Sequence, residues 1–170
     1  MTRYRRTNPE QVAAVRELGI AGIEEGDLAR LLRVQADASL DAVLAFDVIE
    51  HFEREKILVF VDQVRRVLKP GGRWIVHVPN GASILSGRIR YGDLIHELPL
   101  TCSSLTQLML SSGYSRIQCF DDAPPVHGPV SALRWLLWHA FRCVIQLYVV
   151  VETGELDPGQ PLTQNLLAVV

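Results

Sequence analysis

Two carboxylates and one imidazole are grouped within five residues at Asp47, Glu50 and His51. If this segment makes a helical turn, side chains three and four residues apart share a face. Such a set can remove a proton from a bound molecule or coordinate a divalent cation. Acidic residues are also favourable at the start of a helix, where they interact with the positive end of the helix dipole. Both interpretations stay open.

A second group of ionisable side chains lies at Asp93, His96 and Glu97. These residues fall in the segment 83–100, which we interpret as a lid-like loop with short helical pieces. From the lid, His96 could reach a bound molecule from the side opposite to His51. A hydrogen-bond network that only stabilises the loop is the alternative.

Strands and helices around these residues must position them. The nearly continuous apolar run Leu40–Phe46 predicts a strand covered on both faces, as in a parallel sheet. A helix is predicted over Glu53–Leu68, and Lys69–Gly72 forms the turn that ends it. Trp74–Val78 is the next strand, and His77 within it is expected to be a core or wall residue. The alternation of strands and helices predicts an α/β fold.

The remaining segments complete this alternation and suggest one domain over residues 9–170 after a short tail over 1–8. We predict four helices: Pro9–Leu18, a short helix that follows the turn Gly26–Leu28 and ends at Leu32, a helix from Thr101 or Ser103 to Ser112, and Val130–Val151. The predicted strands are Ile20–Glu24, Tyr114–Phe120 and Asn165–Val170.

Composition narrows the class of protein. The 170 residues carry a net charge of -2, which gives no electrostatic footprint for nucleic acid. The cysteines Cys102, Cys119 and Cys143 are odd in number and widely spaced, which argues against a disulfide framework or a zinc site. We therefore expect a cytoplasmic protein, and we see no signal peptide at the start of the chain.

The helix predicted over Val130–Val151 has a broad apolar face that we expect to pack against another surface. Arg134, His139, Arg142 and Gln146 interrupt it, and charged groups inside a bilayer are costly, so a membrane-spanning helix is disfavoured. Three interpretations stay open: an additional helix packed on the domain, a dimer interface, or peripheral contact with a membrane surface.

Two stretches, Asp41–Phe52 and Leu68–Asn80, resemble class I S-adenosylmethionine-dependent methyltransferases, and the sequence of the first narrows this to the small-molecule branch. Tyr91–Glu97 and Ser104–Leu108 are similar to a later segment of that branch, and Leu162–Val170 to its last strand. The resemblance implies a Rossmann-like sheet of strand order 3-2-1-4-5-7-6 with flanking helices.

The resemblance also implies a cofactor, S-adenosylmethionine, and a small-molecule acceptor that is methylated, with oxygen favoured. Asp27 would accept a hydrogen bond from the adenine amino group, and the backbone of Leu28 would read a ring nitrogen. Ala45, Phe46 and Asp47 would line the cleft near the methionine part, because ligands of open α/β sheets bind beyond the strands' carboxyl ends. An N-cap role for Asp27 is also expected and is compatible with adenine binding, and core packing is the alternative for Phe46.

The resemblance implies catalytic roles for His51, Asp47 and His96, with His51 as general base or acceptor-site residue. The ubiquinone-biosynthesis O-methyltransferases carry a similar Glu-x-x-Glu-His motif that binds a metal. Because the first position here is aspartate, one methylene shorter, we expect no metal.

The glycine-rich segment of the family does not match. The family begins with a strand leading to a Gly-x-Gly-x-Gly turn, and a second strand then ends in an acidic residue that holds the ribose. Here no Gly-x-Gly occurs upstream of Gly19, and Pro9–Val12 resembles the helix after that acidic residue. We therefore expect an N-terminally truncated domain that retains strands 3 to 7, without strands 1 and 2.

Two consequences follow from this expectation. Methyl transfer would be impaired or absent, unless a partner restores the cofactor site, and a non-catalytic binding or oligomerisation module is the alternative. Leu40–Phe46 would form an exposed apolar edge that pairs with Ile20–Glu24 or with a second chain.

Overall fold

The computed structural model describes residues 17–19, 26–123 and 125–170. The tail over 1–8, most of the helix predicted over Pro9–Leu18 and the strand predicted over Ile20–Glu24 lie outside these ranges.

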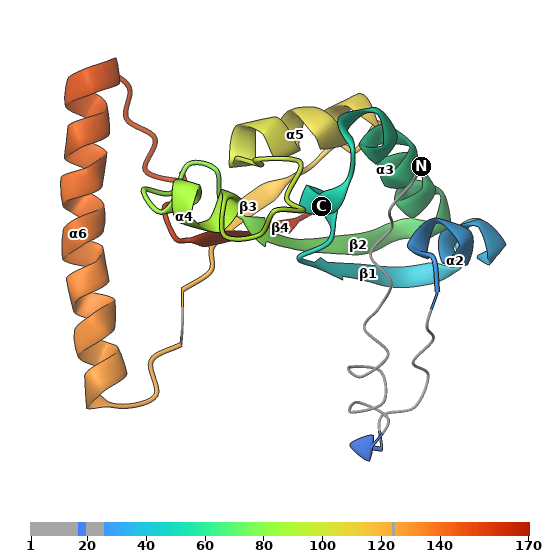
Figure 1. Cartoon of the computed structure of the whole chain (residues 1–170), viewed down its shortest axis with the longest axis horizontal. Coiled ribbons are helices and arrows are strands. Elements are labelled where there is room, and N and C mark those ends of the chain that lie inside the picture. The colour runs from blue at the N-terminus through green and yellow to red at the C-terminus, as the bar shows by residue number, and fades with distance from the viewer. Residues whose placement is uncertain (1–16, 20–25, 124) are drawn as a thin grey trace.

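One mixed sheet of four strands organises the described chain (Figure 1). Its strands lie in the order β1-β2-β4-β3, with β1 parallel to β2 and the other two neighbouring pairs antiparallel. If β1 to β4 are numbered as the fourth to seventh strands of the expected sheet, this order reads 4-5-7-6, as expected. The strands are β1 Leu40–Phe46, β2 Leu68–Pro79, β3 Gln118–Asp121 and β4 Asn165–Val169.

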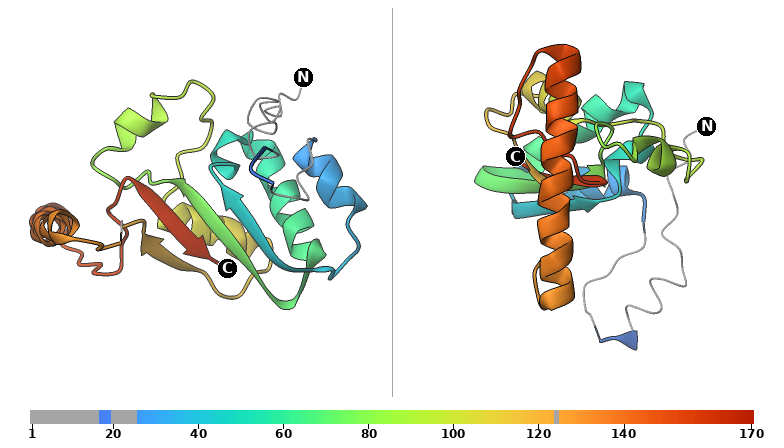
Figure 2. Two further views of the ribbon diagram at one scale, coloured as in Figure 1. Left: turned by 90° about the horizontal axis from the view of Figure 1, so that it is seen from below. Right: turned by 90° about the vertical axis from the view of Figure 1, so that its left-hand side faces the viewer.

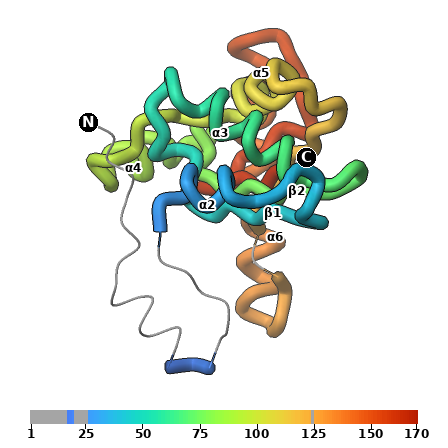
Figure 3. Tube along the Cα trace, turned by 90° about the vertical axis from the view of Figure 1, so that its right-hand side faces the viewer, coloured from blue at the N-terminus to red at the C-terminus, as the bar shows by residue number. Residues whose placement is uncertain are grey.

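Helices flank the sheet, which confirms the predicted α/β class. α3 and α5 cover one face, α2 packs against α3 near β1, and α6 stands beside the sheet (Figures 1, 2 and 3). The α-helices are α2 Leu28–Val34, α3 Arg54–Val67, α4 Ser86–Arg90, α5 Cys102–Ser111 and α6 Pro129–Thr153, and η1 is a 3-10 turn over Ile49–His51.

The core lies between the sheet and the helices α3 and α5. Along β2 the side chains of Trp74, Val76 and Val78 are fully buried, which is the alternation expected of a strand with one covered face. The residues that meet them are also buried: Ile57, Phe60, Val61, Val64 and Val67 of α3, Leu105 and Met109 of α5, and Leu166 and Ala168 of β4. This core holds the carboxyl ends of β1 and β2 in place.

The opposite face of the sheet is exposed at β1 in the described part of the chain and half-buried along β2 and β4, which corrects the prediction that β1 is covered on both faces. Leu44 is 61% exposed and Phe46 54%, whereas Ala45 between them is buried. Phe46 is in register with His77, then Leu167 and then Phe120, so one row of side chains crosses the open face. β1 is also the outermost strand of the sheet among the described residues, so the expected edge is present there.

The predicted turn over Lys69–Gly72 is a bulge within β2. Leu40 pairs with Leu68 and Ala42 with Arg73, so four residues of β2 are accommodated opposite Asp41. Gly71 has a positive φ of 79°, a conformation that side chains strain. A Cβ on Gly72 would lie 2.9 Å from the carbonyl oxygen of Lys69. Both glycines are needed for β1 and β2 to pair.

A disulfide joins Cys102, at the start of α5, to Cys119 in β3, and Cys143 is free and exposed. This contradicts the argument against a disulfide. Wide spacing in sequence was the basis of that argument, but α5 and β3 are connected by a short segment that brings the two Cα atoms to 6.0 Å.

We expect Gly72→Ala to lower the free energy of unfolding by about 1–3 kcal/mol, because the new methyl group meets two backbone carbonyls that cannot move aside. Gly87→Ala is the matched control, since a Cβ there meets nothing within 4 Å and alanine is the better helix former. Urea denaturation measures both. Equal stability of the two variants would contradict this account of the bulge.

Candidate functional site

The loop after β1 brings the ionisable residues to the carboxyl end of the strand. Asp47 has a positive φ of 51°, and its N–H donates to the carbonyl of His77 in β2. This conformation turns the chain sharply from β1 into η1. As a result Glu50 lies beneath the segment 91–100, and its side chain is only 1% exposed.

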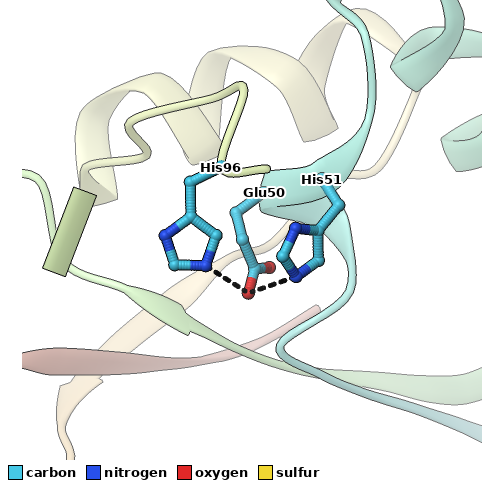
Figure 4. A group of neighbouring side chains, drawn as sticks. All are labelled: Glu50, His51 and His96. Carbon is cyan, nitrogen blue, oxygen red and sulfur yellow. Dashed lines mark ion pairs between the residues drawn. The ribbon is translucent and has the colours of Figure 1, made fainter. Parts of the chain in front are cut away.

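Glu50 lies between two imidazole rings (Figure 4). Its Oε1 is 3.8 Å from Nε2 of His51 and 4.0 Å from Nε2 of His96. The Nδ1 atoms of these histidines are each 3.2 Å from a backbone carbonyl oxygen, of Ile95 for His51 and of Ile89 for His96. Because a carbonyl only accepts hydrogen bonds, both Nδ1 atoms donate, and both Nε2 atoms face the carboxylate.

Backbone hydrogen bonds fix this cluster. The carbonyl of Glu50 accepts from the N–H groups of both Glu97 and Leu98. The segment carrying His96 is therefore tied to η1. Nearby, the side chain of Asn80, after β2, donates to the carbonyls of Pro161 and Thr163 and accepts from the N–H of Ala82.

A cavity of about 180 Å³ opens beside Glu50. It lies between the end of β2, α4 and the segment after α4, so it is bounded by the residues predicted to form a lid. Its lining is Glu50, Pro79, Asn80, Gly81, Ser86, Gly87, Arg90, Tyr91, His96, Leu98 and Pro99. A small molecule in this cavity would contact the carboxylate of Glu50 and the ring of His96.

Burial dominates the electrostatics of Glu50. Its pKa is raised from 4.5 to about 7, chiefly by removal from water; its own backbone hydrogen bond opposes this increase and the charge of nearby Asp47 contributes to it. Neither carboxylate oxygen has a hydrogen-bond partner in the described part of the chain. The cluster therefore holds an exchangeable proton near neutral pH.

Asp47 does not join this cluster, contrary to the expectation of a shared helical face. Its Oδ1 is 2.9 Å from Nδ1 of His77, and Nε2 of the same ring is 3.3 Å from Oδ2 of Asp122. The left-handed backbone at Asp47 breaks the helical spacing that the expectation assumed. Sequence reasoning treated His77 as a wall residue and missed its two carboxylate partners, one of which lies 45 residues away.

The residues assigned to the cofactor are placed as follows. Asp27 is the N-cap of α2, and its Oδ1 accepts from the N–H groups of Ala29 and Arg30, so the N-cap alternative is confirmed. Its other oxygen has no hydrogen bond among the described residues. Ala45 is buried at the end of β1, and Phe46 stacks on His77 with ring centroids 5.4 Å apart. Their contact with a cofactor, like that of Leu28, stays a prediction.

Glu50, His51 and His96 could also hold a metal ion, because one ligand atom from each lies within 4.8 Å of the others. Neutral imidazole Nε2 atoms whose Nδ1 atoms donate to carbonyls are the usual form of metal-bound histidine. The sequence-based expectation of no metal is not tested by this geometry.

The known proteins that this chain resembles are methyltransferases. Residues 6–76 match the family model described as a methyltransferase domain. A protein of Mycolicibacterium smegmatis described as a probable S-adenosylmethionine-dependent methyltransferase is 37% identical over 92 residues, which are 54% of this chain and 34% of that protein. A similarly described protein of Mycobacterium tuberculosis H37Rv is 35% identical over 78 residues, 46% of this chain and 28% of that protein.

Solved methyltransferase structures share the fold. An S-adenosylmethionine-dependent methyltransferase from Archaeoglobus fulgidus superposes with a TM-score of 0.62 at 15% identity, covering 89% of this chain and 67% of its own. One from Mesorhizobium loti superposes with a TM-score of 0.55 at 12% identity, covering 95% and 76%. The chain therefore has the Rossmann-like fold of these enzymes, although it spans only about a third of the length of the curated relatives it matches.

The raised pKa of Glu50 predicts a pH dependence of stability. Between pH 4.5 and about 7 the folded chain binds this proton more tightly than the unfolded chain, so the free energy of unfolding falls as the pH rises, by on the order of 3 kcal/mol. In Glu50→Gln this contribution disappears, because glutamine does not titrate.

Urea denaturation at several pH values, with a chelator present, measures the difference between the two chains. Glu53→Gln is the control, since this neighbouring glutamate is 46% exposed. If wild type and Glu50→Gln lose the same stability across this window, the proton is not held by Glu50.

Proposed function

We propose that this chain forms the acceptor side of an S-adenosylmethionine-dependent methyltransferase that methylates an oxygen atom of a small molecule. The observation that carries the proposal is the buried carboxylate of Glu50, which faces two imidazole Nε2 atoms at the wall of a cavity. The position of this cluster beyond the carboxyl end of β1, where open α/β sheets bind ligands, supports it.

In this proposal the cluster removes the proton of the acceptor. S-adenosylmethionine, when bound, supplies a methyl group attached to a positively charged sulfur. Nε2 of His96, at the cavity, would take the proton from an acceptor hydroxyl, while the cofactor would supply the methyl group and leave as S-adenosylhomocysteine. Glu50 stabilises the resulting imidazolium, and the carbonyl of Ile89 holds the ring in place through Nδ1. His51 shares the same carboxylate and can receive the proton next.

The described residues fit the methionine and acceptor side of the cofactor better than its nucleoside side. Asp47 presents a carboxylate that is 60% exposed at the end of β1, suited to a positively charged group. For the nucleoside, Asp27 offers its second oxygen to the adenine amino group and Leu28 its backbone. No Gly-x-Gly occurs in the 170 residues to approach the ribose and carboxylate.

We expect the 170-residue chain to bind S-adenosylhomocysteine with a dissociation constant of about millimolar or weaker, because so few contacts cannot offset the entropic cost of association. Isothermal titration calorimetry measures this, with the M. smegmatis relative as positive control. Micromolar affinity would contradict the predicted impairment, while leaving the acceptor chemistry open.

The acceptor chemistry has its own test. At saturating S-adenosylmethionine, mass spectrometry of a panel of phenols, sugars and hydroxy acids should detect slow O-methylation. We expect His96→Gln and Glu50→Gln to reduce the rate by about 10²–10³-fold, since each removes part of the proton acceptor. His127→Gln is the matched control, because His127 is exposed and, among the described residues, its ring bonds only the carbonyl of Pro125. Transfer that survives both substitutions would exclude the cluster as the base.

One observation favours the alternative of a non-catalytic oligomerisation module. α6 has no buried residue, although it is long and apolar enough to cross a membrane. This function requires no cofactor, so unchanged self-association in Glu50→Gln, with no methyl transfer by wild type, would support it over catalysis.

A further inference from the structure

α6 interrupts a β-hairpin. β3 and β4 are antiparallel neighbours, yet residues 122–164 separate them, and α6 occupies the middle of that insertion. Figure 2 shows the helix standing clear of the sheet. Its main tie to the domain is Arg142, which pairs with Asp121 and donates to the carbonyls of Pro158 and Gln160. The face that carries Arg142 is therefore turned to the domain.

The opposite face is an uninterrupted apolar stripe. At 100° per residue, ten exposed apolar side chains fall within an arc of about 140° that contains no polar residue. We call these residues the outer stripe: Val130, Leu133, Leu136, Leu137, Ala140, Phe141, Val144, Leu147, Tyr148 and Val151. A contiguous exposed apolar surface of this length marks an interaction site.

Two opposite charges border the outer stripe on the same side. Arg134 and Glu152 are 18 residues apart, which is five turns, so they point in the same direction about 27 Å apart along the helix. Both are equally far from residue 143. Glu152 bonds Tyr148 of its own helix, and Arg134 has no partner among the described residues.

This charge placement selects one arrangement of two helices. In a two-fold parallel pair of identical helices these borders lie on opposite sides of the seam, so neither Arg134 nor Glu152 meets an opposite charge. In an antiparallel pair with its two-fold axis at residue 143, Arg134 of each helix lies beside Glu152 of the other. Ala140 and Val144, two of the smaller side chains of the outer stripe, then meet at the centre, where they allow close approach.

We propose that α6 is a dimerisation helix whose outer stripe packs antiparallel against α6 of a second copy of this chain. Two Arg134–Glu152 ion pairs fix its register and direction. The domains then extend from the two opposite sides of the helix pair, because Arg142 holds each domain on the face away from the stripe. This inference does not depend on methyl transfer.

A charge swap tests the proposal, because residues 134 and 152 are too far apart to interact within one chain. Sedimentation velocity without lipid should show a wild-type dimer. Arg134→Glu and Glu152→Arg should each weaken the dimer by about tenfold, since like charges then face each other twice. The double variant should recover wild-type affinity. Arg33→Glu, on the distant helix α2, is the control for a charge change alone, and Val144→Glu should abolish the dimer.

Far-ultraviolet circular dichroism checks that each variant keeps its helix content. A wild-type chain that stays monomeric without lipid would overturn the proposal, as would a double variant no tighter than the single ones. Binding of a monomer to phosphatidylcholine vesicles, unaffected by the charge reversals, would assign the outer stripe to a lipid surface instead.

Discussion

A carboxylate buried without a hydrogen-bond partner costs several kcal/mol if it stays charged, and Glu50 occupies such a position. The rest of the site depends on this constraint. Because two imidazole Nε2 atoms face Glu50, a proton can be shared between the carboxylate and the two rings. Each side chain thereby reduces the cost of burying the others. The backbone carbonyl of the same residue accepts two hydrogen bonds from Glu97 and Leu98. Glu50 thus sets both the charge of the site and the position of the segment that encloses the cavity.

Patterns along the sequence predicted the elements well where one packing surface decides them. α3 has apolar residues at helical spacing that meet β2, and the order of the four strands agrees with the resemblance to methyltransferases. His51 and His96 were singled out from opposite segments, and the structure brings their rings to 4.9 Å. Glu50 appeared in the same motif, but the sequence does not reveal that it is the buried member, since burial depends on the segment 91–100 folding over it.

What the sequence did not predict depends on single backbone conformations and long-range contacts. The positive φ of Asp47 directs its carboxylate to His77 instead of Glu50, and an aspartate at that position gives no sign of it. Asp122 reaches the other side of the same ring from beyond β3. The pairing of Cys102 with Cys119 likewise follows from how α5 returns to the sheet. An apolar run such as Leu40–Phe46 indicates a strand, but not how many of its faces are covered.

Asp121 and Asp122 connect the two parts of the molecule that carry the proposals. Asp121 accepts from the backbone of Leu162 and Thr163 with one oxygen and from Arg142 of α6 with the other. Asp122, the next residue, pairs with His77, which in turn pairs with Asp47 at the end of β1. The end of β3 therefore holds α6 through Asp121, and through Asp122 it holds His77, which borders the site on the open face of the sheet. The hairpin accommodates the long insertion because Asp121, at the end of β3, bonds Leu162 and Thr163, just before β4. The two ends of the insertion are thereby held together, and α6 lies between them.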